Sequence, residues 1–492
     1  MSRVLLINPP DRGWLNKLLG LRAPPLGLMY TAASLEKAEV PVDILDANLS
    51  NKNHEEVAFE AKRRRPEIVG LSAVTPTVKA AMKIMKSIRM AMPNVVGIFG
   101  GVHPTFLPAE TLANCPELDI VVIGEGEETM LDLVKALDGF SWENEEERKI
   151  GSSRMRQLAE RVSKIRGIAF RDPENPSSTR ITPPRPLIQD LDSLPFPARH
   201  LVPFSQYTVR DRETPIGGII TSRGCPFACE YCSSSRIGGT GFRCRSPANV
   251  VDELTILHEK YGLTQIEFLD DIFTLNKRRA AQIASEIRMR GLDINWVASS
   301  RVDTIDKDLI SNLKRGGLNA LYYGVEAGSQ RVLDLMNKHV KIEQVKDAFR
   351  ATHECGVATL GSFMFGYPGE TLDEMRQTMG LSVKLNPDFA QFSILTPFPG
   401  TPIYQRLKAS GLLVTEDWDR YTVLEPIIKY ETFGYSAKKL KSILSEAYRR
   451  FYLRPYYLAK HLGQFPLVLG TLFRQIYIKL NEQLSRPKAP KI

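Results

Sequence analysis

The most informative stretch of this chain is Arg223-Gly224-Cys225-Pro226-Phe227-Ala228-Cys229-Glu230-Tyr231-Cys232. Its three cysteines follow the spacing C-x3-C-x2-C, with an aromatic residue just before the last one. Three closely spaced thiolates can hold three irons of a cubane iron–sulfur cluster and leave the fourth iron open for a small chelating ligand. A structural zinc site would need a fourth ligand, normally from a second Cys or His pair, and no such pair follows at short range. The spacing therefore favours an iron–sulfur cluster over zinc or inert core cysteines.

This motif resembles the signature of the radical S-adenosylmethionine enzymes. The resemblance implies that Cys225, Cys229 and Cys232 are the catalytic metal ligands of a 4Fe–4S cluster whose open iron binds S-adenosylmethionine. It also implies that cleavage of this cofactor yields a 5′-deoxyadenosyl radical, and that Tyr231 lies against the adenine.

Length and composition indicate a large globular protein. A chain of 492 residues gives a prior of about three domains. The six cysteines do not form a disulfide framework, because three belong to the motif and Cys115, Cys244 and Cys355 are scattered, so we expect a reducing cytoplasm. No apolar run of 18 residues exists, and Met1-Ser2-Arg3 leads directly into an apolar strand, so neither a membrane span nor a signal peptide is expected.

Residues 1–140 alternate short apolar strands with helices, which predicts an α/β domain with a doubly wound, Rossmann-like parallel sheet. Strands are expected at 4–8, 42–45, 68–74, 95–99 and 120–123, and helices at 26–37, 55–65 and 78–92. Ligands of such sheets bind beyond the carboxyl ends of the strands, where Gly, Pro and small polar residues gather in this chain. A cofactor-free flavodoxin-like domain and a nucleotide-binding domain are the open alternatives on spacing alone.

Four phrases in this region resemble the cobalamin-binding domain attached to many radical S-adenosylmethionine enzymes: Asn8-Pro9-Pro10, Pro24-Pro25-Leu26-Gly27-Leu28, Gly100-Gly101-Val102-His103-Pro104-Thr105 and Gly124-Glu125-Gly126-Glu127. The resemblance implies cobalamin contacts by Pro9, Leu26, Gly27, Ser72, Thr75, Thr77, Gly100, Gly101, His103, Gly124, Glu125 and Gly126. The D-x-H-x-x-G element that ligates cobalt in other cobalamin domains is absent. We therefore expect no His ligand to cobalt, and expect His103 to cap a loop or touch the corrin edge.

Residues 205–425 alternate again and predict a partial (β/α)6 barrel with its site at the C-terminal face. Strands are expected at 219–222, 265–269, 296–299, 320–325, 360–365 and 389–395. Residues 141–204 are predicted to form a connector, with a solvated helix in the densely charged stretch 143–164. Residues 426–492 are predicted to form a basic helical C-terminal region.

Polar residues and a glycine follow the barrel strands, where side chains usually face the ligand. The resemblance implies S-adenosylmethionine contacts by Asp270, Asp271, Arg301, Glu326, Ser329 and Gly366. The two aspartates would take the methionine amine, and Arg301 would take the carboxylate as a charge-assisted fork. A helix cap or a barrel ion pair is the alternative for each acid. Glu370 opens a helix and is interpreted as structural.

The C-terminal region carries most of the excess charge. From residue 449 to the end there are nine Lys or Arg and one acid, Glu482, against a net charge of +9 for the whole chain. The apolar run Phe465 to Phe473 is too short to span a bilayer. A helical cap over the barrel mouth, contact with a membrane surface and contact with an acidic partner all stay open, and nucleic acid is not the expected partner.

As a whole, residues 1 to about 425 resemble cobalamin-dependent radical S-adenosylmethionine enzymes, most of which are methyltransferases. The resemblance implies methyl transfer from methylcobalamin to an unactivated carbon of a lipid or isoprenoid, or of a protein side chain such as a glutamine of methyl-coenzyme M reductase. It implies a reductant such as ferredoxin or flavodoxin, and a cytoplasmic or peripheral membrane location. A non-methylating ring cyclase is the first alternative. A cofactor carrier or electron-transfer protein is the second, and the polar strand ends argue against it.

Overall fold

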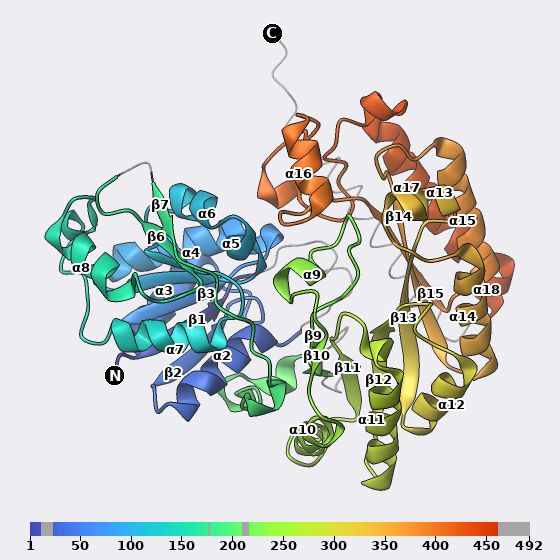
Figure 1. Cartoon of the computed structure of the whole chain (residues 1–492), viewed down its shortest axis with the longest axis horizontal. Helices are drawn as coiled ribbons and strands as arrows, with labels where there is room; N and C mark the ends of the chain where they lie inside the picture. The colour runs from blue at the N-terminus through green and yellow to red at the C-terminus, as the bar shows by residue number, and fades with distance from the viewer. Residues whose placement is uncertain (11–22, 176–177, 209–215, 461–492) are drawn as a thin grey trace.

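The computed structural model describes residues 1–10, 23–175, 178–208 and 216–460. Two mainly parallel sheets stand side by side, each covered by helices, with the N-terminal sheet at the left of Figure 1 and the second sheet at the right. The segment that carries the cysteines runs between them. The predicted α/β fold, with a Rossmann-like domain followed by a partial barrel, is confirmed.

Five parallel strands form the core of the N-terminal sheet, in the order β2-β1-β3-β4-β5. They are β1 (Val4–Asn8), β2 (Val42–Asp46), β3 (Ile68–Ser72), β4 (Val96–Gly100) and β5 (Ile120–Val122). Successive residues of a strand point to opposite faces, so Leu6 enters the core shared with α2 (Leu26–Lys37) and Leu5 enters the core shared with α4 (Val78–Ala91). Covering both faces explains why the central strands β1, β3, β4 and β5 are almost entirely apolar.

Part of the predicted connector extends this sheet. Strands β6 (Ile168–Arg171) and β7 (Thr179–Ile181) add to it beyond β5, both antiparallel. The helix α8 (Ser153–Val162) begins at the side-chain cap of Ser152 and buries Met155, Leu158, Ala159 and Val162. The solvated helix expected within 143–164 is thus shorter and only partly solvated, because four apolar residues at helical spacing form a buried face among the charges.

The second sheet is an open barrel of six parallel strands in the order β15-β14-β13-β12-β11-β8. They are β8 (Ile216–Ile219), β11 (Gln265–Phe268), β12 (Asn295–Ser300), β13 (Leu318–Glu326), β14 (Ala358–Phe365) and β15 (Phe389–Ile394). Helices α10 (Pro247–Glu259), α11 (Lys277–Met289), α12 (Lys307–Arg315), α14 (Ile342–Glu354) and α15 (Leu372–Leu385) follow the strands.

The strand expected at 219–222 divides into two elements. Strand β8 ends at Ile219, and Ser222–Arg223 forms β9, which pairs antiparallel with β10 (Arg243–Cys244). The cysteine segment is therefore the loop of a small hairpin rather than a direct continuation of the barrel strand.

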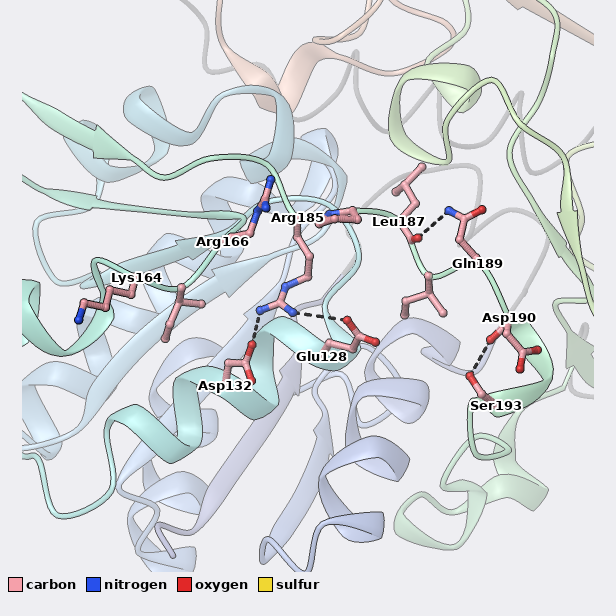
Figure 2. Close-up of a pocket in the computed structure, with 12 residues that line it drawn as sticks. Glu128, Asp132, Lys164, Arg166, Arg185, Leu187, Gln189, Asp190 and Ser193 are labelled. Atoms are coloured by element: carbon pink, nitrogen blue, oxygen red, sulfur yellow. Dashed lines mark hydrogen bonds and ion pairs between the residues drawn. The ribbon is translucent and has the colours of Figure 1, made fainter.

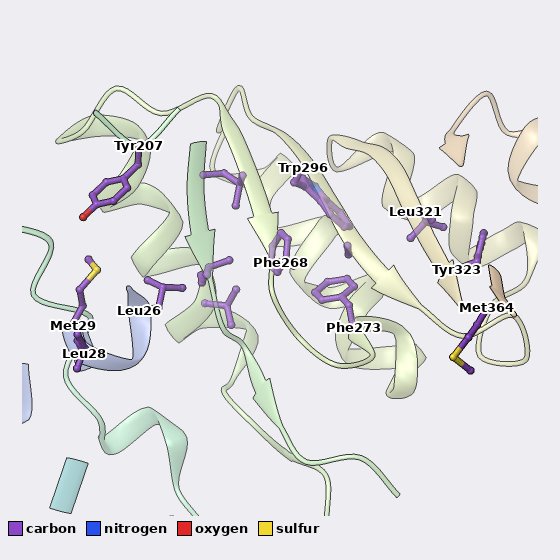
Figure 3. Close-up of a cluster of buried hydrophobic side chains, with 14 of the residues drawn as sticks. Leu26, Leu28, Met29, Tyr207, Phe268, Phe273, Trp296, Leu321, Tyr323 and Met364 are labelled. Carbon is purple, nitrogen blue, oxygen red and sulfur yellow. The ribbon is translucent and has the colours of Figure 1, made fainter. Parts of the chain in front are cut away.

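The outer faces of the barrel strands pack on the helices, as Figure 3 shows for Phe268, Trp296, Leu321 and Tyr323. Trp296 donates from Nε1 to the carbonyl of Gly316 at the end of α12, across 2.7 Å. The same apolar cluster includes Leu26 and Met29 of α2. The two domains thus share one continuous core.

Two tyrosines of α17 (Ala437–Tyr452) close the exposed edge of the barrel sheet. The hydroxyl of Tyr452 donates to the Ala390 carbonyl at 2.8 Å and accepts from the Ala390 amide at 3.1 Å. Tyr448 does the same to Phe392, at 3.0 and 3.3 Å. An uncovered edge strand invites aggregation, and these hydroxyls satisfy its backbone groups instead. The run Phe465 to Phe473 lies outside the described residues, and no helix within 1–460 that the structure describes is long and apolar enough to cross a membrane.

Candidate functional site

The cysteine loop is held in shape by glycines. Gly224 has φ +92°, and a Cβ there would stand 2.2 Å from the carbonyl oxygen of Gly241, so no other residue fits without moving backbone. The Cys225 amide donates to the Gly239 carbonyl at 3.1 Å, and the Cys232 amide donates to the Cys229 carbonyl at 3.2 Å. The loop geometry is therefore built into the fold.

The three motif thiols suit a cluster. None of them is in a disulfide, Cys225 and Cys229 are buried, and Cys232 is partly buried. Burial raises the pKa of Cys225 and Cys229, and the nearby Cys232 thiol raises it further. Among the described residues no three His, Cys, Asp or Glu converge on a single metal-ion position. A cubane needs one thiolate per iron, so its ligands stand further apart than those of a single ion.

A buried lysine that the sequence analysis missed lies beside this loop. Lys338 donates from Nζ to Oε1 of Glu326 at 3.0 Å and to Oη of Tyr231 at 3.1 Å. Its positive charge also lowers the pKa of the Cys229 thiol, although burial raises that pKa more. Glu326, predicted to contact S-adenosylmethionine, has φ +69° and is thus held in an unusual backbone conformation next to Tyr231. Two predicted residues and an unpredicted lysine form one cluster.

Arg301, which follows β12, stacks on a residue of the cysteine loop. Its guanidinium carbon stands 3.6 Å from the ring centroid of Phe227. Its Nε and Nη2 donate to Asp303 at 2.9 and 2.8 Å, and Nη2 also donates to the Lys338 carbonyl at 2.9 Å. Within the described part of the chain, Nη1 has no acceptor. The side chain is therefore fixed with one edge engaged and one nitrogen still able to donate.

The two predicted amine ligands occupy different environments. Asp270 is 3% exposed, and its carboxylate accepts from the amides of Thr221 at 2.6 Å and Ser222 at 2.9 Å, and from the Thr221 hydroxyl. It thereby shapes the turn between β8 and β9. Asp271 accepts from Oγ of Ser234 at 2.7 Å and lines a cavity described below.

The other two predicted contacts have evident structural roles. Ser329 caps α13 (Gln330–Leu335), accepting from the Val332 amide and donating to Glu374 at 2.8 Å. Gly366 has φ +83°, and a Cβ there would stand 2.8 Å from a Leu440 methyl group.

Glu370, one turn beyond Gly366, is almost fully buried. It accepts from the amides of Gly366 at 2.7 Å and Tyr367 at 3.2 Å. These two bonds hold the loop after β14, so Glu370 has a structural role, but it does not open the helix as expected, because α15 begins at Leu372 after the Thr371 cap. Burial raises the pKa of this carboxyl to about 8.

A cavity of about 350 Å³ lies at the carboxyl ends of the N-terminal strands. Seven of the residues predicted for cobalamin line it: Gly27, Ser72, Gly100, Gly101, Gly124, Glu125 and Gly126. No atom stands within 4 Å of a Cβ placed on Gly27 or Gly124, so bare backbone faces open space there. Such a surface fits a large flat ring. The opposite wall comes from the barrel domain, through Ser222, Arg223, Gly224, Leu269 and Asp271.

Five predicted cobalamin contacts do not line this cavity: Pro9, Leu26, Thr75, Thr77 and His103. Leu26 packs against Gly218 at the domain boundary, and its Cδ1 would lie 3.3 Å from a Cβ placed on that glycine. His103 is buried, with Nδ1 3.2 Å from the Thr75 hydroxyl and its ring 5.1 Å from that of Trp418. Burial lowers its pKa to about 4, so the imidazole is neutral.

The Glu125 carboxylate was predicted to contact the cofactor, but it is engaged in ion pairs and a backbone hydrogen bond. It accepts from Nη1 of Arg223 at 3.0 Å, from Nη1 of Arg243 at 2.9 Å and from the Ile188 amide at 2.8 Å. The sequence analysis missed both arginines. An Arg directly before the Gly224-Cys225 pair was the available signal, but its partner lies 98 residues away.

A second pocket, of about 730 Å³, lies beside α7 (Glu127–Ala136). Figure 2 shows Arg185 reaching down to this helix, where it pairs with Asp132 and with Glu128, the latter at 3.4 Å. No residue predicted to bind a cofactor lines this pocket.

Two family matches divide the chain in the same way as the sheets. The B12 binding domain matches residues 16–134, and the radical SAM superfamily matches residues 219–381. The cavity at the N-terminal strand ends thus belongs to a B12-binding domain, and the cysteine loop belongs to a radical SAM domain.

Relatives share this arrangement over nearly the whole chain. An uncharacterized methyltransferase of Pyrococcus horikoshii is 39% identical over 94% of this chain and 95% of its own. The anaerobic magnesium-protoporphyrin IX monomethyl ester cyclase of Cereibacter sphaeroides is 29% identical over 92% of this chain and 70% of its own. Among solved structures, the radical S-adenosylmethionine methyltransferase TsrM of Kitasatospora setae, with cobalamin and a 4Fe–4S cluster bound, matches with a TM-score of 0.66 and 21% identity, over 85% of this chain and 76% of its own. That last match establishes a shared fold.

Proposed function

Because the chain belongs to the cobalamin-dependent radical S-adenosylmethionine methyltransferase family, we propose that it methylates an unactivated carbon of its substrate. The observation that carries this proposal is the cavity whose two walls come from the B12-binding domain and from the start of the cysteine loop. When bound, the cluster with S-adenosylmethionine supplies a hydrogen-abstracting radical, and cobalamin supplies the methyl group. The cavity brings the B12-binding domain up to the residues that lead into the cysteine loop, and methyl transfer requires the methyl donor and the radical to act at the same substrate atom.

Residues of the cysteine loop and of the barrel strand ends would hold these groups. Cys225, Cys229 and Cys232 provide one thiolate for each of three irons. Nη1 of Arg301 would donate to the carboxylate of S-adenosylmethionine, and Asp271 would accept from its amine, because Asp270 is already engaged by the β8–β9 turn. Tyr231 and Gly366 provide walls for the adenine.

The inner face of the barrel indicates where the substrate lies. Trp296 and Tyr323 face the helices, so their strand neighbours with the opposite orientation, Glu267 and Tyr322 among them, face the barrel interior. Burial raises the pKa of Glu267, and burial with this nearby carboxylate raises that of Tyr322 to about 12. Hydrophobic side chains usually fill a barrel interior, so this polar lining suits a substrate that presents hydrogen-bonding groups. A polar-headed lipid or isoprenoid and a protein side chain both fit.

The test is product analysis with S-adenosylmethionine that carries a deuterated methyl group. Anaerobically reconstituted protein with hydroxocobalamin, reduced flavodoxin or ferredoxin and cell extract is expected to yield a product bearing the trideuteromethyl group. The variant with Cys225, Cys229 and Cys232 replaced by Ala should yield neither this product nor 5′-deoxyadenosine. Loss of both in a Cys115, Cys244 and Cys355 variant instead would contradict the assignment of the cluster.

Ring closure is the second candidate, because the 29% identical relative from Cereibacter sphaeroides is named a cyclase. A product that lacks the deuterated methyl group but forms together with 5′-deoxyadenosine would favour it. A protein that forms no 5′-deoxyadenosine under any condition would be a carrier rather than an enzyme.

A further inference from the structure

Four charged side chains meet where the B12-binding domain touches the radical SAM domain. Glu125 and Glu127 come from the B12-binding domain, and Arg223 and Arg243 lie opposite each other on β9 and β10. Nη2 of Arg223 donates to Glu127 at 2.5 Å, while its Nη1 and that of Arg243 share Oε1 of Glu125 at 3.0 and 2.9 Å. We call these four residues the domain latch.

The latch is largely withdrawn from water. The side chains of Arg223, Glu125, Arg243 and Glu127 are 16%, 12%, 7% and 7% exposed. Buried charges are costly unless each is paired and hydrogen-bonded, and breaking one pair leaves its partner charged and unpaired. The structure adds bonds that help: the Ile188 amide donates to Glu125, and Nη2 of Arg243 donates to the Gly238 carbonyl at 2.8 Å. The latch is therefore a specific joint rather than a loose surface contact.

Each half of the latch also belongs to a cofactor wall. Gly124 and Gly126 line the cobalamin cavity on either side of Glu125, so its carboxylate and the cavity wall share one short loop. Arg223 immediately precedes Gly224 and Cys225. Gly238, which accepts from Arg243, adjoins Gly239, which accepts from the Cys225 amide. The latch therefore joins a loop of the B12-binding domain to the segment that leads into the first cluster cysteine.

We propose that the domain latch sets the position of the cobalamin cavity relative to the cluster loop, which makes Arg223 and Arg243 positioning residues for both cofactors. A methyl group can reach a radical carbon only if both cofactors act on the same substrate atom. Small displacements of one cofactor from the other therefore lower the rate strongly. Glu125, Glu127 and Arg223 also line the cavity, so the latch joins its two walls directly. The proposal rests on the proposed function only in assuming that both cofactors are loaded.

Amide hydrogen exchange on the unloaded protein tests the latch without any cofactor. In Arg223→Met, peptides covering 124–130 and 222–239 are expected to exchange about tenfold faster than in the wild type, while the remaining strands keep their protection. Glu127→Gln should act in the same direction, and the double variant should add little to Arg223→Met, since the pair that Glu127→Gln removes is one of the two that Arg223→Met removes. Lys79→Met is the matched control, because it removes another ion pair between the two domains, that of Lys79 with Asp417.

Pulsed electron paramagnetic resonance on the loaded protein measures the geometry itself. The distribution of distances between Co(II) of bound hydroxocobalamin and the reduced cluster should broaden in Arg223→Met and stay narrow in Lys79→Met. Arg223→Lys, which keeps the charge but loses the fork, should lie between them. Wild-type exchange and an unchanged distance distribution in Arg223→Met would overturn the proposal. So would the same changes in Lys79→Met, or faster exchange throughout both domains in Arg223→Lys. A wild-type protein that takes up no corrinoid would contradict the proposed function, while the exchange result would still decide the latch.

Discussion

Lys338 donates from Nζ to Glu326 across 3.0 Å, although the two side chains are only 7% and 12% exposed. The same nitrogen bonds the hydroxyl of Tyr231, the aromatic residue of the cysteine motif. This pair therefore ties the end of β13 to the loop that holds the cluster.

Removing Lys338 is expected to cost stability, because it leaves the Glu326 carboxylate buried and unpaired. Lys338→Met should lower the free energy of unfolding by about 3 kcal/mol, measured by urea denaturation of the unloaded protein. Lys307→Met is the matched control, since Lys307 pairs with Glu354 where both side chains are about half exposed, and it should leave stability nearly unchanged. Equal effects of the two variants would show that the Lys338 pair is no stronger than a surface pair.

The stability of the barrel domain should depend on the ionisation of Glu370. The pKa of this carboxyl is about 8 in the folded protein, against 4.5 for the ordinary group, because burial penalises its charge. Between these values the folded state keeps a proton that the unfolded state has lost, so stability falls as pH rises from about 4.5 and levels off above about 8. Glu370→Gln should remove this loss and gain roughly 2–4 kcal/mol relative to wild type between about pH 5 and pH 8.5 in urea unfolding.

Glu374 provides the control for this measurement. Its pKa is lowered to about 2, mainly by hydrogen bonding to Arg331, so its stabilising effect is lost only as pH falls from about 4.5 through about 2. Glu374→Gln should therefore differ from wild type by a constant amount between pH 5 and pH 8.5. A constant difference for Glu370→Gln as well would show that Glu370 is ionised in the folded protein at neutral pH.

His103 should not ligate cobalt. Its ring is buried between Thr75 and Trp418 and does not line the cavity. The Co(II) spectrum of the loaded protein in electron paramagnetic resonance should show no nitrogen splitting from an imidazole, and His103→Gln should leave that spectrum unchanged. Nitrogen splitting in the wild type that disappears in His103→Gln would establish His103 as a ligand.

The basic end of the chain should direct the protein to anionic membranes. Each Lys or Arg near an anionic surface contributes about 1 kcal/mol, and the region from residue 449 on has nine of them, five of which follow Lys460. Full-length protein is expected to float with anionic vesicles, less so as salt rises, and not with neutral ones. A chain that ends at Lys460 is the comparison, because α17 and α18 (Pro455–Lys460) pack on the barrel and must be kept. Absence of flotation with either vesicle would point to an acidic protein partner.

Local patterns in the sequence were enough to predict most strands of the two sheets and the iron–sulfur cluster, whereas cobalamin and S-adenosylmethionine were implied by the family resemblance. The helix expected at 26–37 is α2, and the strand expected at 4–8 is β1, each with the predicted bounds. A helix buried on one face has apolar residues at helical spacing, and a strand buried on both faces is a short apolar run. Such patterns can be recognised without knowing which residues the element contacts. The motif of Cys225, Cys229 and Cys232 is equally local, because its ligands lie within one loop.

Only the tertiary structure decided which charged groups meet. Lys338 reaches Tyr231 across 107 residues, and Arg223 reaches Glu125 across 98, so neither pair leaves a periodic trace in the sequence. The adjacent acids Asp270 and Asp271 could not be told apart from the sequence either. Asp270 accepts hydrogen bonds within the β8–β9 turn, whereas Asp271 lines the cavity. Periodicity records whether a side chain is buried, whereas its partner depends on how two separate sheets come together. The sequence by itself thus determined the two domains and the cluster ligands, and the packing of one domain on the other determined the joint between the cofactor sites.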